Sequence, residues 1–188
     1  MTQTVVPRPI AWILTTNDND SLNLAPFSYF NAVGSDPATL AFSIGLQPDG
    51  TEKDTLRNIR RDPHMVIHIA SCSQLVDLNQ SSATLPPGES EVSASNLSLV
   101  SEPHFPLPRL EEAKIAFFCR LDQIIEIGNN RQALVLAEVE SIYVHDEATE
   151  TLDNGRLKIL ADKVEPLARL GASEYVSFGE ILSIKRPA

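Results

Sequence analysis

The chain consists mainly of short apolar runs separated by polar turns, which is the pattern of β-strands in hairpins. Residues 10–16 are rich in β-branched and aromatic side chains, and the polar cluster at residues 17–20 predicts a turn after them. Residues 22–33 predict the returning hairpin strand. Residues 39–44 predict a third, largely buried strand after the turn residues 34–37. The first quarter of the chain therefore predicts antiparallel strands.

Two short helices and one long irregular segment interrupt the strands. Asp54 or Thr55 can cap the first helix, residues 65–70 predict a strand, and Ser73 can cap the second helix. Residues 81–108 contain several prolines and few signals of regular structure. They predict a long surface excursion, and such segments commonly have a function or contact a partner.

The C-terminal half predicts a long hairpin and little other regular structure. Residues 114–127 alternate apolar and polar side chains and turn at residues 128–130 into a strand over residues 133–144. The remaining expectations are an acidic loop, a helical turn and a closing strand, at residues 145–165, 166–170 and 178–184. Six or seven strands in hairpins, with two short helices, favour a mainly β, antiparallel barrel that forms one domain over residues 1–188.

Composition narrows the function classes. The formal charge of -10 argues against nucleic acid as the main partner, because 25 acidic residues outnumber 15 basic ones and phosphates require a basic face. A local basic site for one phosphate is still compatible with this charge. No apolar stretch approaches membrane-spanning length, and no signal-peptide pattern is visible. Cys72 and Cys119 form no CxxC motif, which indicates reduced thiols and a soluble cytoplasmic protein.

Residues 23–31 mix aromatic and apolar side chains with polar ones, which is unusual for a buried strand because each polar group taken out of water needs a partner. The polar members are Asn23, Ser28, Tyr29 and Asn31. Pro26 lacks a backbone N–H, which favours a sheet edge or a bulge. Two interpretations fit: a kinked core strand, or a strand that faces a flat, mostly apolar ligand with a polar edge, such as a flavin ring.

A second group of polar residues surrounds the predicted start of the first helix. Lys53, Asp54 and Thr55 begin this helix, and Ser43 and Gly45 end the preceding strand. Free amides at a helix N-terminus and the Lys53 ammonium group favour an anion. The same residue types are also ordinary helix caps. If a phosphate binds here, we expect the Asp54 carboxylate to turn away from it.

Common catalytic motifs are absent from the sequence. Without a GxGxxG, P-loop or GxSxG motif, the chain has no Rossmann nucleotide site and no recognisable nucleophile. His64 and His68 are four residues apart around a predicted strand, a separation of about 13 Å that is too long for both to bind one metal ion.

Several short motifs occur in a fixed order along nearly the whole chain. They are Pro7-Arg-Pro-Ile-Ala-Trp12, Asn23-Leu-Ala-Pro-Phe-Ser-Tyr-Phe-Asn31, Asp36-Pro37, Phe42-Ser-Ile-Gly45, Lys53-Asp-Thr55, Asn58-Ile59, Pro86-Pro-Gly88, and Leu167-Ala-Arg-Leu-Gly171 with Tyr175. Together they resemble the flavin reductase-like family, and most closely its long, flavoredoxin-like subgroup. The resemblance implies a split β-barrel that binds FMN without a covalent bond and is usually a homodimer.

The resemblance also implies which residues bind FMN. Residues that border the isoalloxazine ring, mainly through backbone groups, would be Ser28, Tyr29, Phe30 and Asn31. Residues that hold the phosphate would be Ser43, Gly45, Lys53, Asp54 and Thr55. Leu46 and Gln47 stand where the family often has a basic residue. Either Arg8 or Arg57 compensates for this difference, or the phosphate is bound more weakly.

The implied activity is that of an NAD(P)H-dependent flavin oxidoreductase, in which NADH or NADPH passes a hydride to FMN. No side chain is assigned as an acid or a base. One alternative is a non-catalytic flavin carrier or flavoredoxin-like electron-transfer protein, and another is a barrel that serves only as an interaction module. We expect residues 81–108 to wrap a second subunit and to help wall the flavin, because they carry apolar side chains without forming a core of their own.

Overall fold

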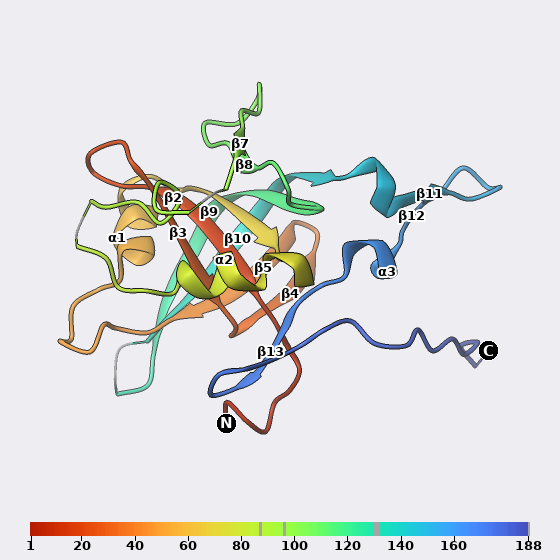
Figure 1. Ribbon diagram of the computed structural model, residues 1–188, viewed down its shortest axis with the longest axis horizontal. Coiled ribbons are helices and arrows are strands. Elements are labelled where there is room, and N and C mark those ends of the chain that lie inside the picture. Colours follow the sequence, from red (N-terminus) through yellow and green to blue (C-terminus); the bar gives the residue numbers. More distant parts are fainter. Residues whose placement is uncertain (87, 96, 130–131, 188) are drawn as a thin grey trace.

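The computed structural model describes residues 1–86, 88–95, 97–129 and 132–187. Its main sheet has seven strands, and each neighbouring pair is antiparallel in the order β3-β2-β6-β9-β10-β5-β4 (Figure 1). These strands are β2 (Ala11–Thr16), β3 (Leu22–Phe27), β4 (Phe30–Ser35), β5 (Ala38–Ile44), β6 (His64–Ile69), β9 (Ile115–Ile127) and β10 (Gln132–Val144). The predicted mainly β, antiparallel fold is confirmed. The expected turn at residues 128–130 lies partly outside the described residues.

β3 and β4 are at opposite edges of this sheet although they follow one another in the sequence. Ser28 and Tyr29 connect them, and the Tyr29 carbonyl accepts a hydrogen bond from the Ser43 N–H at 2.9 Å. The edge strands β3 and β4 are therefore joined by this short connection and are not paired through backbone hydrogen bonds, so the barrel is not closed. The prediction of one strand over residues 22–33 is wrong, because the chain changes edge at this connection. Pro26 lies on an edge strand, as its missing N–H predicts.

The helices of the described residues are α1 (Asp54–Arg61), α2 (Leu75–Gln80) and α3 (Ala161–Val164). Of these, α1 contacts β2 and β3, and α2 contacts β3. Short 3-10 turns occupy Cys72–Gln74, directly before α2, and Asp146–Ala148. The N-cap of α1 is Lys53, so the expected caps Asp54 and Thr55 already lie inside the helix. Ser73 is likewise inside the second helical segment. Its start is fixed at Ser71, whose N–H donates to the Gln74 side chain at 2.9 Å.

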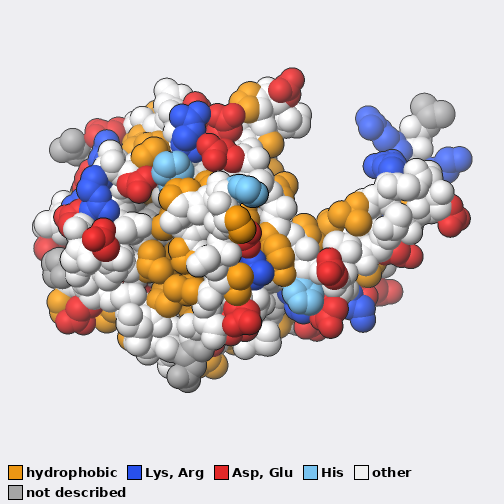
Figure 2. Space-filling view, turned by 90° about the horizontal axis from the view of Figure 1, so that it is seen from above, with side chains coloured by type: hydrophobic (Ala, Val, Ile, Leu, Met, Phe, Trp, Pro, Cys, Tyr) orange, Lys and Arg blue, Asp and Glu red, His pale blue; other side chains and the backbone are white. Residues whose placement is uncertain are grey.

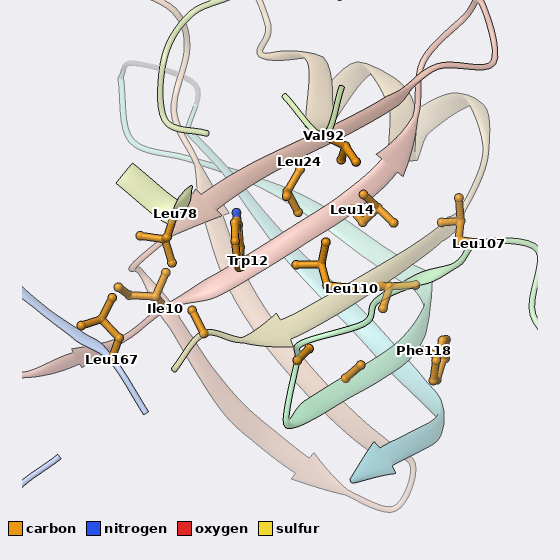
Figure 3. Packing of buried hydrophobic residues seen from close by; sticks show 14 residues of the cluster. Ile10, Trp12, Leu14, Leu24, Leu78, Val92, Leu107, Leu110, Phe118 and Leu167 are labelled. Carbon is orange, nitrogen blue, oxygen red and sulfur yellow. The ribbon is translucent and has the colours of Figure 1, made fainter. Parts of the chain in front are cut away.

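The central strands are apolar on both faces because both faces are covered. In β2, Trp12 and Leu14 belong to one cluster of buried side chains, and Ala11 and Ile13 belong to a second. Successive side chains of a strand point to opposite faces, so these clusters lie on the two sides of the sheet. Figure 3 shows the first cluster, in which side chains from β2, β3 and α2 converge. The Trp12 indole N–H is paired with Ser81 Oγ at 2.8 Å.

Residues 81–108 pack mainly against the barrel of their own chain. Among the described residues of this segment, the regular structure is β7 (Leu99–Val100), which pairs with β8 (Arg109–Leu110). Val92 and Leu107 are buried in the first cluster, which contains Trp12, and Leu97 and Phe105 pack against it. Two of the five apolar residues that suggested contact with a second subunit, Leu97 and Phe105, thus cover this chain's own core, and Leu99 is 36% exposed. The contact of this segment with a second subunit stays a prediction.

The C-terminal quarter differs most from the expected elements. The predicted loop at residues 145–165 contains α3 and a hairpin of β11 (Thr149–Thr151) and β12 (Leu157–Ile159). The predicted helical turn at residues 166–170 is wrong, because this segment enters β13 (Ala168–Gly171), which pairs with β1 (Arg8–Pro9) and β14 (Glu174–Val176). Residues 178–184 form no strand, and the C-terminal segment extends away from the barrel (Figures 1 and 2).

Two further expectations concern thiols and membranes. Cys72 and Cys119 are both free, and burial raises the pKa of the Cys119 thiol to about 12. Within the described ranges, no helix is long and apolar enough to cross a membrane.

Candidate functional site

A cavity of about 420 Å³ lies between β3, the start of α1 and the segment that follows α2. Four parts of the chain form its wall. They are Asn23, Ala25, Pro26 and Phe27 of β3; Leu46, Gln47 and Pro48 after β5; Lys53, Asp54 and Thr55 at α1; and residues 81–85 with Glu91. The two polar stretches that stand out in the sequence therefore meet in one cavity.

The start of α1 places the Lys53 ammonium group and the Asp54 carboxylate in the wall of this cavity. The Lys53 side chain makes no cap hydrogen bond, so the first amides of the helix are left for water or a ligand. The Lys53 ammonium nitrogen lies 5.7 Å from the centroid of the Phe27 ring, within the range of a cation–π contact. Asp54 forms an ion pair with Arg57 one turn along the helix, which partly neutralises its charge.

A buried hydrogen-bond network fixes α1 to the sheet. The Asn23 amide donates to Thr15 Oγ1 at 3.1 Å and to Thr55 Oγ1 at 3.0 Å. The Asn58 amide donates to Thr15 Oγ1 at 3.1 Å and to Asn17 Oδ1 at 2.8 Å. Each of these five side chains is at most 3% exposed. Because Asn23 donates to Thr55, the threonine oxygen acts as an acceptor and its own O–H remains able to donate.

Glu91 is a cavity residue that sequence reasoning missed. Its carboxylate accepts the Leu24 N–H at 2.9 Å, which ties the irregular segment to the outer edge of β3. Burial raises the pKa of Glu91, and the Asp54 carboxylate raises it further, whereas the bond from Leu24 lowers it. No motif or periodicity marks Glu91, since its place depends on a loop that packs on a strand distant in sequence.

A second cavity, of about 250 Å³, adjoins the first, because Pro26 and Ser82 line both. Ser28, one of the predicted ring-binding residues, lies in the wall of this second cavity with Arg169 and Tyr175. The structure thus brings Lys53, Asp54 and Thr55 into the first cavity and Ser28 into the neighbouring one.

The other predicted residues do not line these two cavities. Tyr29 is 38% exposed, Asn31 is exposed, and Phe30 packs against the second core cluster. Ser43 is bonded through its N–H to the carbonyl of Tyr29, and Gly45 directly follows β5. Their contact with a flavin stays a prediction. In the part of the chain that the structure describes, no group of three or more His, Cys, Asp or Glu side chains is arranged to hold a metal ion.

The sequence matches the model of the flavin reductase-like domain over residues 2–162, which is most of its length. The chain belongs to the flavin reductase-like family. Among its relatives, the uncharacterized protein YwrF of Bacillus subtilis is 33% identical over 189 aligned residues, which cover 98% of this chain and 90% of YwrF. The family expected from the ordered motifs is confirmed.

Several solved structures have the same fold. Component B of nitrilotriacetate monooxygenase from Bacillus cereus is 30% identical with a TM-score of 0.87, over 97% of this chain and 90% of that one. A split-barrel protein from Shewanella frigidimarina (TM-score 0.86, 99% and 89% covered) and flavoredoxin of Desulfovibrio vulgaris (0.80, 96% and 91%) are each 20% identical. At that identity they show the fold alone, and they confirm the expected split barrel.

Proposed function

We propose that this protein binds FMN and reduces it with NADH or NADPH. Membership of the flavin reductase-like family supports a flavin-related oxidoreductase. The observation that carries the proposal is the cavity of about 420 Å³, where the mostly apolar wall of β3 and the start of α1, with Lys53, face the same space.

The residues of this cavity fit both ends of FMN. The volume is in the usual range for small-molecule sites. Ala25, Pro26 and Phe27 offer an apolar wall to a flat ring, while Lys53 and the first amides of α1 offer donors to a phosphate. The proposed part of Thr55, whose side chain is buried, is to hold this helix start on β3 through the hydrogen bond from Asn23. The same proposal includes ring contacts from Ser28, Tyr29, Phe30 and Asn31 and phosphate contacts from Ser43, Gly45 and Asp54.

The protein's own part in the reaction is to bind and orient. FMN supplies the hydride chemistry when it is bound. β3 orients the ring, α1 holds the phosphate, and residues 81–85 cover the cavity from the side of α2. Glu91 adds a carboxyl group that, because of its raised pKa, keeps a proton to higher pH than a carboxyl group in water does.

The chain has no separate fold for binding the pyridine nucleotide, because its sequence lacks a GxGxxG motif. We therefore expect the nicotinamide to stack directly on the flavin in a shallow site, with modest affinity. The formal charge of -10 repels the dinucleotide, and most strongly at low salt. The similarity to a monooxygenase component makes a partner monooxygenase one candidate for the final electron acceptor. A cytoplasmic homodimer completes the proposal.

Anaerobic mixing of the FMN-loaded protein with NADH, and separately with NADPH, tests the reductase function. We expect at least one of them to bleach the visible absorbance of the flavin within minutes. If neither does so while FMN stays bound, the protein is instead a non-catalytic flavin carrier or flavoredoxin-like electron-transfer protein. If the purified protein binds no FMN, the remaining interpretation is a barrel that serves only as an interaction module.

A further inference from the structure

The second cavity has the composition of an anion-binding site. Its volume is about 250 Å³, and the wall consists of Ile10, Pro26, Ser28, Leu78, Asn79, Ser82, Arg169 and Tyr175. Arg169 is charged, and among the described residues no acidic side chain shares this wall with it. The whole chain has a formal charge of -10, so a cavity wall whose charged residue is an arginine differs from the rest of the molecule.

Arg169 is held in place without an ion pair. It lies opposite Tyr175 in the β13–β14 ladder, its guanidinium carbon is 4.4 Å from the centroid of the Tyr175 ring, and it donates to the Ala172 carbonyl. In the described part of the chain it forms no ion pair. A guanidinium group has five N–H donors, so several remain for a ligand.

Arg109 stacks on a tyrosine in the same way but has a carboxylate partner. Its guanidinium carbon also stacks on a tyrosine, Tyr143, at 3.7 Å. However, Arg109 is paired with the Glu102 carboxylate at 2.9 Å and donates to the carbonyls of Leu110 and Glu111 at 3.1 and 3.2 Å. Its charge is thus compensated within the fold, whereas that of Arg169 is not.

The rest of the wall suits a flat organic molecule. Ile10, Leu78 and Pro26 offer apolar surface, and the hydroxyl and amide groups of the other polar residues can orient a ligand. The Tyr175 hydroxyl lies 3.4 Å from Asn79 Oδ1, so these two side chains face each other. The cavity is smaller than the roughly 300–1,000 Å³ of sites for drug-sized ligands. One ring with one anionic group fits this space better than a whole dinucleotide.

We propose that this cavity binds a one-ring aromatic carboxylate, with the carboxylate on Arg169 and the ring among Tyr175, Leu78 and Pro26. Guanidinium and carboxylate groups match in geometry and form charge-assisted hydrogen bonds. The shared residues Pro26 and Ser82 place this ligand beside the proposed flavin. Its role as a substrate rests on the proposed flavin function, but the binding itself does not.

Isothermal titration calorimetry with benzoate tests the proposal on the full chain, both free of FMN and saturated with it. We expect benzoate to bind in both states and benzamide, which has the same shape without the charge, to bind about tenfold more weakly or worse. Arg169→Gln should weaken benzoate binding about tenfold or more, and Arg169→Lys should lose less. The matched control is Arg156→Gln, since Arg156 is exposed in the β11–β12 hairpin and is no part of the wall.

Equal affinity for benzoate and benzamide would overturn the proposal, and this comparison needs only the unaltered protein. Unchanged benzoate binding in Arg169→Gln, or exclusion of benzoate by FMN, would overturn it as well. If benzoate binding depends on Arg169 while no FMN binds at all, the anion site stands and the proposed flavin function fails.

Discussion

Lys53 carries the charge that matters most to the proposed phosphate site. The neighbouring Asp54 is paired with Arg57, and Leu46 and Gln47 in the cavity wall are neutral. Charge-assisted hydrogen bonds contribute about 1.5–3 kcal/mol each. We therefore expect Lys53→Ala to weaken FMN binding about tenfold or more. Riboflavin, which has no phosphate, should lose much less affinity. Fluorescence titrations with both flavins measure the difference.

A matched variant separates this effect from a general change of charge. Lys158 is exposed on the β11–β12 hairpin, where it pairs with Glu150 at 3.3 Å, outside the wall of the cavity. Lys158→Ala removes the same charge and should leave both flavin affinities unchanged. Equal losses for FMN and riboflavin in Lys53→Ala would contradict the phosphate assignment.

At the scale of elements, His68 connects three strands through one buried ring. The Leu110 N–H of β8 donates to His68 Nε2 at 3.0 Å, so the other ring nitrogen carries the proton and donates to the Trp12 carbonyl of β2 at 3.0 Å. This arrangement requires a neutral ring. Burial lowers the pKa of His68 to about 4, the charge of Arg109 lowers it as well, and the bond to Trp12 partly opposes them.

Stability should therefore depend on pH through His68. With an unfolded pKa near 6.5 and a folded pKa of about 4, the unfolded state binds more protons between these values. As pH falls through this window, the free energy of unfolding should drop by up to about 3 kcal/mol from this residue, and no further below it. Urea unfolding at several pH values measures this. His68→Gln should be less stable at neutral pH but lose less stability on acidification, and equal slopes would contradict the assignment.

The elements that the sequence predicts best are those whose signals are local. The alternation in residues 114–127 and the β-branched run in residues 10–16 match β9 and β2 closely. In contrast, the apolar spacing at residues 166–170 suits a helical turn, yet this segment leads into β13 and pairs with β1 near the other end of the chain. Pairing over such a distance overrides local propensity and cannot be read from either segment alone.

In the candidate site too, the residues that could be predicted from the sequence are those with local signals. Lys53 and Thr55 could be predicted because a helix start is a local feature, and Pro26 marks an edge strand wherever that edge lies. Glu91 and residues 81–85 could not, because only the packing of an irregular segment on β3 and α2 brings them to the cavity. Arg169 and Tyr175 belong to a motif of the sequence, but their place in a cavity wall could not be predicted. Only the pairing of β13 with β14 brings them into one wall with Ser28.

At the scale of the whole molecule, two segments extend from the barrel with apolar side chains in water. Leu157 of the β11–β12 hairpin is 60% exposed, and in the C-terminal segment Ile181, Leu182 and Ile184 are 60%, 84% and 96% exposed. Figure 2 shows the C-terminal segment as an arm that leaves the body of the molecule. Apolar surface of this kind is typical of a protein–protein contact. We therefore propose that these two segments, in addition to residues 81–108, contribute to the homodimer interface.

Deletion of residues 177–188 tests this interface. Burying a large aliphatic side chain contributes about 1.5–3 kcal/mol, so loss of the three from Ile181, Leu182 and Ile184 should raise the dimer dissociation constant about 100-fold or more. Light scattering over a range of protein concentrations measures the change, with replacement of Lys185 and Arg186 by serine as the control that keeps the apolar residues. The deletion leaves the wall of the flavin cavity intact, so FMN binding reports whether the barrel is still folded. A full-length protein that is monomeric at micromolar concentration would refute the dimer. A deletion variant that stays dimeric would place the interface elsewhere on the barrel.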